Sequence, residues 1–170
     1  MKKISLNSVT LALVMLIAGT IWMSAPAHAF TWVSMQGGSG KVEIPENTTG
    51  LRYKGWGLDF SQKPNLTNWV HYQIPTTRSS SISPKVRYIY LEYYKSTHIG
   101  KIAAFHIYDG RVKIQEIDAP ANTAGSWATM VIDLGEPRSI SKGVGVSIYV
   151  TSGAGGYTNF EIGNVKVRFE

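Results

Sequence analysis

The chain has 170 residues, of which 17 are Lys or Arg and 11 are Asp or Glu; its formal net charge is +6 at pH 7, and it contains no cysteine. This composition excludes a disulfide framework and a cysteine nucleophile. The basic residues are scattered singly, which is typical of a soluble surface rather than of nucleic-acid recognition, and the net charge favours anionic neighbours only mildly.

The amino-terminal segment has the features of a secretory signal peptide. Lys2 and Lys3 are followed by a mostly apolar run over residues 9–23 and by the small-x-small sequence Ala27-His28-Ala29. We predict a signal peptide over residues 1–29, cleaved before Phe30, and a product that is secreted or periplasmic. An uncleaved anchor is the alternative, but the apolar run is shorter than the about 20 residues that a spanning helix needs. No membrane span is therefore expected after cleavage.

Residues 30–170 form a mature chain whose length suits a single domain with one core. Short runs rich in Val, Ile, Tyr, Trp and Thr recur between clusters of Gly, Pro, Ser and Asn, and helical periodicity is almost absent. The pattern predicts an all-β chain. The predicted strands are Phe30–Met35, Lys41–Ile44, Leu51–Phe60, Trp69–Ile74, Val86–Lys95, Lys101–Tyr108, Arg111–Asp118, Trp127–Leu134, Val144–Thr151 and Phe160–Phe169, with longer connections over 76–85, 119–126, 135–143 and 152–158.

The strongest turn signal is Asp109-Gly110, which lies between two of these strands. A two-residue type I′ turn requires residues that accept positive φ, so this dipeptide predicts a β-hairpin. Around ten short strands without a parallel crossover favour a two-sheet antiparallel β-sandwich of jelly-roll type.

Three of the predicted strands each have one apolar face and one face that mixes aromatic and polar residues. Side chains alternate between the two faces of a sheet. Ile89 and Leu91 therefore point away from the tyrosines of the Arg87–Tyr94 stretch, and Phe105 and Ile107 group with Ala103 on the apolar side of their strand. If the three strands are neighbours, the mixed faces merge into one predicted ligand-binding surface. It consists of Trp69, His71, Gln73, Tyr88, Tyr90, Glu92, Tyr94, His106 and Tyr108.

Such a surface suits a carbohydrate ligand. Aromatic rings offer flat apolar area to the CH-rich face of a sugar, and Gln73, Glu92 and the histidines can hydrogen-bond at its rim. An ordinary sheet surface is the competing interpretation, because cross-strand aromatic pairs stabilise sheets by about 0.2–1 kcal/mol each without any ligand. The sequence leaves both interpretations open.

Metal binding and catalysis are weaker alternatives. His71, His106 and Glu92 are suitable zinc ligands, but they come from separate strands without a metal-binding spacing. The chain has no G-x-S-x-G motif, and Glu92 has no evident carboxylate partner at the about 5–10 Å that glycosidases require. We therefore predict no catalytic residues, no metal site and no cofactor.

Four motifs follow one another in the mature chain: Gly55-Trp56-Gly57, Asn68-Trp69-Val70-His71 leading to Ile74-Pro75-Thr76, His106-Ile107-Tyr108-Asp109-Gly110, and Gly143-Val144-Gly145-Val146-Ser147-Ile148. Their order and spacing resemble a small β-rich domain family of bacteria and fungi whose function is unknown. The resemblance extends from about Trp32 to Phe169. It implies a self-contained β domain and no activity.

The functional prediction is non-catalytic binding of a glycan or another cell-surface polymer. The first alternative is a structural or adhesive surface protein that contacts another protein through its tyrosine-rich face. A hydrolase is the second alternative. No nucleic-acid partner is expected, and the oligomeric state is not predicted.

Overall fold

The computed structural model describes residues 30–76 and 83–170. The predicted signal peptide, residues 1–29, lies outside the described residues. Within the described ranges, no helix is long and apolar enough to cross a membrane.

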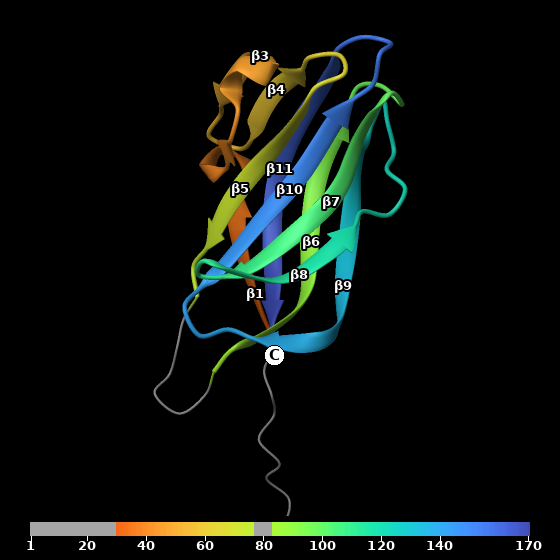
Figure 1. The fold of residues 1–170 in the computed structure, drawn as a ribbon. Coiled ribbons are helices and arrows are strands. Elements are labelled where there is room, and N and C mark those ends of the chain that lie inside the picture. Colours follow the sequence, from red (N-terminus) through yellow and green to blue (C-terminus); the bar gives the residue numbers. More distant parts are fainter. Residues whose placement is uncertain (1–29, 77–82) are drawn as a thin grey trace, which may run out of the picture.

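The described chain forms two antiparallel sheets packed face to face, which confirms the predicted all-β sandwich (Figure 1). The six-stranded sheet has the order β3-β4-β11-β6-β9, and β1 also pairs with β11. The five-stranded sheet has the order β2-β5-β10-β7-β8. The strands and two short 3-10 helices are β1 Thr31–Gln36, η1 Gly37–Ser39, β2 Lys41–Val42, η2 Pro45–Asn47, β3 Thr48–Tyr53, β4 Leu58–Gln62, β5 Thr67–Ile74, β6 Lys85–Lys95, β7 Gly100–Asp109, β8 Val112–Asp118, β9 Trp127–Ser139, β10 Val144–Ser152 and β11 Thr158–Phe169.

The predicted strand Leu51–Phe60 is wrong, because this segment contains a hairpin of two strands, β3 and β4. The chain reverses at Lys54–Gly57, where the two residues exchange backbone hydrogen bonds with N···O distances of 2.7 and 3.3 Å. A Cβ atom at Gly57 would lie 2.8 Å from the carbonyl oxygen of Ile162, so the turn passes too close to β11 for a side chain at this position. The Gly55-Trp56-Gly57 motif therefore lies in the turn of a hairpin.

The predicted hairpin between β7 and β8 is confirmed, but its turn lies one residue further along the chain. Asp109 pairs with Val112, so the loop consists of Gly110 and Arg111, and Gly110 has φ of 60°. The side chain of Asp109 binds the segment before β10, as described below. Asp109 therefore belongs to the ladder and not to the turn.

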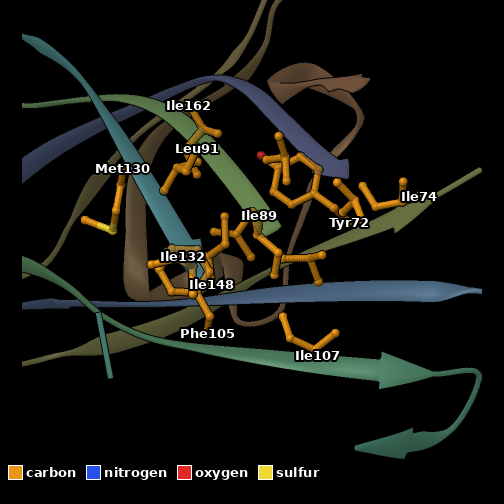
Figure 2. Packing of buried hydrophobic residues seen from close by; sticks show 14 of the residues in the cluster. Tyr72, Ile74, Ile89, Leu91, Phe105, Ile107, Met130, Ile132, Ile148 and Ile162 are labelled. Atoms are coloured by element: carbon orange, nitrogen blue, oxygen red, sulfur yellow. The ribbon is translucent and has the colours of Figure 1, made fainter. Parts of the chain in front are cut away.

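The core lies between the two sheets and consists of their inward-facing apolar side chains. Figure 2 shows Ile89, Leu91 and Met130 from the six-stranded sheet facing Phe105 and Ile148 from the five-stranded sheet. The predicted alternation on β5, β6 and β7 holds, with one exception at the start of β7. A register shift between β10 and β7 places Ile102 in the core and leaves Ala103 only partly buried.

Candidate functional site

The nine predicted ligand-binding residues do not form one surface. Trp69, His71 and Gln73 lie on β5, and His106 and Tyr108 lie on β7, both in the five-stranded sheet. Tyr88, Tyr90, Glu92 and Tyr94 lie on β6, in the six-stranded sheet. The predicted merging of the three strands is therefore wrong, because alternation fixes which side of a strand a residue occupies and not which sheet the strand joins.

The outer side of the five-stranded sheet, here called the front face, is completed by the central strand β10. Figure 1 shows β10 between β5 and β7. Ser147 lies opposite both His71 and His106, and Gly145 lies opposite both Gln73 and Tyr108. Tyr149 lies opposite Trp69. We define the front face as Trp69, His71, Gln73, His106, Tyr108, Gly145, Ser147 and Tyr149.

Sequence reasoning missed the three residues that β10 contributes. Gly145, Ser147 and Tyr149 alternate with buried valines and isoleucine, so the sequence pattern did indicate that they share a side. Their membership of the site could be inferred only once β10 was known to lie between β5 and β7.

A row of polar side chains crosses the middle of the front face. His71 shares a hydrogen bond with Ser147 (Nδ1···Oγ, 2.7 Å) and contacts Glu43 through its other ring nitrogen (Nε2···Oε2, 3.3 Å). Across β10, His106 Nε2 lies 3.2 Å from Oε2 of Glu116. Each histidine is thus held by a carboxylate at its own edge of the sheet.

Glu116, at the β8 edge of this row, has a lowered pKa. Its hydrogen bond and ion pair with Lys113 lower its pKa, and the contact with His106 lowers it further. Glu116 is therefore ionised at neutral pH.

The aromatic part of the front face gathers around Trp69. The ring centroid of Trp69 lies 4.3 Å from that of His106 and 4.7 Å from that of Tyr149, with interplanar angles of 37° and 35°. Since Trp69 and His106 come from the strands on either side of β10, their rings meet above the central strand. The partly exposed indole therefore forms a low apolar platform beside the polar row.

A hollow lies next to this platform because Gly145 has no side chain. It encloses about 240 Å³ and is lined by His71, Gln73, Tyr108, Gly110, Arg111, Gly145 and Ser147. A Cβ atom at Gly145 would lie 3.3 Å from Cβ of Tyr108, so a side chain at this position would crowd Tyr108 at the wall of the hollow. A second hollow of about 390 Å³, which shares Gln73 and Gly110, continues toward Lys142. The front face therefore combines an aromatic surface with a concave, hydrogen-bonding strip.

The outer side of the six-stranded sheet, here called the back face, is a separate aromatic surface. It comprises Tyr88, Tyr90, Glu92 and Tyr94 of β6 together with Trp32, Trp56 and Trp127, of which the three tryptophans are exposed. Trp127 lies 5.8 Å from Trp56 and 6.2 Å from Tyr94 between ring centroids.

Cations cover several rings of the back face. Nζ of Lys166 lies 4.6 Å from the ring centroid of Tyr90, and Nζ of Lys54 lies 4.5 Å from that of Trp56. The guanidinium of Arg168 lies 5.0 Å from the ring of Tyr88. These cation–π contacts occupy ring area that a flat ligand would otherwise use.

The front face resembles a serine hydrolase site only superficially. Ser147, His71 and Glu43 form a hydrogen-bonded chain of the right residue types. However, Ser147 lies in the centre of a strand that pairs on both sides, so its neighbouring backbone N–H groups belong to the ladders and are not free to bind an oxyanion. The two carboxylates of the row stand at opposite edges, roughly four strand spacings or about 19 Å apart at the backbone, which is too far for paired glycosidase chemistry.

The alternative zinc site does not exist, because Glu92 lies on the back face while His71 and His106 lie on the front face. In the part of the chain that the structure describes, no three His, Asp or Glu side chains come together to hold a metal ion.

Among known proteins, this chain is similar in fold to solved structures. No protein-family model and no curated protein matches the sequence. The low-affinity xylan-binding module CBM86 from Roseburia intestinalis superposes with a TM-score of 0.52 at 12% identity, covering 82% of this chain and 96% of that one. A family 29 carbohydrate-binding module mutant complexed with cellulohexaose has a TM-score of 0.49 at 10% identity, covering 82% of this chain and 92% of that one. The family 29 module from Piromyces equi has a TM-score of 0.49 at 9% identity, covering 82% of this chain and 89% of that one. The superposition on CBM86 shows a two-sheet jelly-roll sandwich fold like that of this carbohydrate-binding module.

Proposed function

We propose that the protein binds a glycan without cleaving it, and that the front face is the binding site. The observation that supports this most directly is the juxtaposition of Trp69 with the hollow over Gly145, on a fold like that of a xylan-binding module. A sugar ring would lie with its CH-rich face on the platform of Trp69 and Tyr149. The hydroxyl groups would reach Gln73, His71 and Arg111 at the hollow.

We propose binding without hydrolysis because the geometry of the front face does not suit a hydrolase. Ser147 has backbone ladders on both sides, and Glu43 and Glu116 lie at opposite edges of the sheet. The two histidines and Ser147 would therefore act as hydrogen-bonding partners of the ligand.

Titration of the protein with soluble xylan, cello-oligosaccharides and galactan, followed by calorimetry, tests the proposal. Trp69→Ala and Gln73→Ala should each weaken binding at least tenfold, because they remove the apolar platform and a rim hydrogen bond. Trp127→Ala is the matched control, since it removes an exposed tryptophan from the back face. Binding that survives Trp69→Ala in the folded protein, or that is absent from every glycan tested, would rule out the front face as a glycan site.

A second candidate function is protein contact through the back face. The observation that favours it is the group of exposed tryptophans, together with Lys54 stacked on Trp56 and Arg168 stacked on Tyr88. Aromatic residues and Arg are enriched in protein interfaces. Under this alternative, chemical cross-linking of the wild type should recover a partner protein. Trp127→Ala should abolish that recovery, and Trp69→Ala should not.

We further propose that the protein is secreted or periplasmic after removal of residues 1–29, and that it belongs to the β-rich family whose motifs it resembles. The charged start, apolar run and small-x-small sequence support export. Amino-terminal sequencing of the exported protein should begin at Phe30. A mature protein that retains its apolar segment would indicate an anchor instead.

A further inference from the structure

A cavity that belongs to neither face lies at the opposite end of β7 from its hairpin turn. It encloses about 430 Å³ and is lined by residues from the start of β7 and from the loop that joins β8 to β9. Lys95, His98, Lys101 and Asn122 are among its lining residues. We call it the basic pocket.

The loop that covers the basic pocket is fixed by hydrogen bonds to both sheets. The side chain of Asn122 behaves like a strand partner, accepting from the backbone N–H of Ile102 (3.0 Å) and donating to its carbonyl (2.9 Å). The backbone N–H of Gly125 donates to the carbonyl of Lys95 (2.7 Å), and that of Thr123 donates to the hydroxyl of Tyr93 (3.0 Å). The pocket is therefore preformed.

Within the described residues, Lys95 is a buried cation without a carboxylate partner. Its side chain is 2% exposed, and its ammonium donates to the carbonyls of Gly100 (2.9 Å) and Asn122 (3.3 Å). Burial, together with the charge of Lys101, lowers the pKa of Lys95. An ammonium has three donors, and a buried charge without a counter-ion is unfavourable. An anion in the pocket would offset that cost.

The other titratable side chains that line the pocket are both basic. Lys101 and His98 both line it, and within residues 30–76 and 83–170 neither forms an ion pair with a carboxylate. No Asp or Glu is among the lining residues, whereas Ala103, Ala119 and Pro120 supply an apolar wall. The lining thus suits a ligand with a negative group and a small apolar body.

We propose that the basic pocket binds a small oxyanion group such as a carboxylate or a sulfate. The volume exceeds what one ion fills, since a water molecule occupies about 30 Å³ of liquid, so a sugar that carries a carboxylate fits the pocket better than a free inorganic ion. The oxyanion lies beside Lys101 and accepts from Lys95. This site shares no lining residue with the hollow over Gly145 and does not depend on the glycan-binding proposal.

Thermal unfolding of the mature chain at constant ionic strength provides the test, with sodium glucuronate, sodium sulfate and glucose as three separate titrants. We expect saturable stabilisation by glucuronate and none by glucose. Stabilisation by sulfate as well would mean that the site takes free ions in addition to sugar-borne ones. Stabilisation by sulfate alone would assign the site to inorganic oxyanions.

Substitutions test whether the stabilisation by anions arises at the basic pocket. Lys101→Gln should weaken the apparent affinity at least fivefold, and Lys95→Met should abolish the response if the variant folds. Lys113→Gln, a lysine that pairs with Glu116 on the front face, is the control and should leave the response unchanged, as should Trp69→Ala. No saturable response to either anion, an equal response to glucose, or equal weakening by Lys113→Gln would overturn the proposal.

Discussion

Gly37 is a residue whose side chain is excluded by its surroundings. It is buried in η1, where the chain leaves β1 of the six-stranded sheet for β2 of the five-stranded sheet, and its carbonyl accepts a hydrogen bond from the hydroxyl of Tyr72 (3.1 Å). A Cβ atom at this position would lie 1.6 Å from the carbonyl oxygen of Ile162. Because that oxygen belongs to the backbone of β11, it cannot move without disturbing the sheet.

We therefore expect Gly37→Ala to lower the free energy of unfolding by about 3 kcal/mol, at the upper end of typical overpacking costs. Urea denaturation followed by circular dichroism would measure it. Gly55→Ala is the control, because a Cβ atom there meets nothing within 4 Å, and its effect should stay within about 0.5 kcal/mol. Equal losses in the two variants would contradict this interpretation of Gly37.

Asp109 joins the β7–β8 hairpin to the segment before β10. Its carboxylate accepts hydrogen bonds from the backbone N–H of Ser141 (2.9 Å) and Gly143 (3.2 Å) and from the hydroxyl of Ser141 (2.6 Å). Burial alone would raise the pKa of Asp109, but these bonds and one from the N–H of Lys142 outweigh it and lower the pKa. A carboxyl with a lowered pKa stabilises the fold above its unfolded pKa, about 3.9, and this contribution is lost as pH falls through the folded value.

Asp109→Asn should therefore reduce the free energy of unfolding at pH 7 by about 1–2 kcal/mol, as the loss of a comparable capping carboxylate does. The difference between the wild type and the variant should shrink as pH falls below about 4. Denaturation curves at several pH values would show this, with Asp118→Asn at the exposed end of β8 as the control. A difference that stays constant down to the acid limit would mean that the charge of Asp109 is irrelevant.

At the scale of elements, the loop between β8 and β9 depends on the two hydrogen bonds that link Asn122 to Ile102. Asn122→Ala leaves the N–H and the carbonyl of Ile102 without these partners. Amide exchange of Ile102 should accelerate at least tenfold, and that of Thr123 should also rise because the loop is released. Hydrogen exchange measured by NMR would detect both changes. Ala121→Ser, next to Asn122 in the loop, should leave exchange at Ile102 unchanged, and similar acceleration in that variant would contradict the role of the Asn122 amide.

Most strands could be predicted because apolar and polar side chains alternate strongly along them. The prediction was wrong where the chain reverses or where a strand lies at the edge of a sheet. Leu51–Phe60 looked continuous because Lys54–Gly57 has aromatic and basic residues that a strand also accepts. The predicted loop over residues 135–143 lies largely within β9, which extends to Ser139 despite Gly135 and Pro137. The strand tolerates both residues because β9 is an edge strand, and the register shift opposite Arg87 leaves this part of it unpaired.

The site was predicted in part for a related reason. Trp69, His71 and Gln73 were correctly grouped on one side of their strand, and so were His106 and Tyr108. The contact between His71 and Ser147 joins residues 76 positions apart, and no local pattern encodes it. The same limit explains why Tyr88, Tyr90, Glu92 and Tyr94 were assigned to the wrong partners.

At the scale of the whole molecule, the two aromatic faces are separated by the core. Packed sheets lie about 10 Å apart, so side chains on their outer sides are too distant to interact directly. The free-energy changes caused by Trp69→Ala and Trp127→Ala should therefore add within about 0.5 kcal/mol in the double variant.

The pair Trp56→Ala and Trp127→Ala should deviate from additivity instead. Their rings are 5.8 Å apart in an edge-to-face arrangement, for which coupling of about 0.5–1.5 kcal/mol is expected. Double-mutant cycles from denaturant unfolding would compare the two pairs. Strong coupling between Trp69 and Trp127 would contradict the independence of the faces.

The pairing of β1 with β11 determines how the domain would respond to mechanical force. Thr31 lies opposite Phe169 and Gln36 opposite Asn164, so the beginning of β1 and the end of β11 meet at the same end of the sandwich. Tension applied at residues 31 and 169 would load the hydrogen bonds of this antiparallel pair one after another, starting at Thr31. The domain would then open as a zipper, with β1 peeling away first, whereas a pull along the strands in opposite directions would have to shear the whole ladder at once.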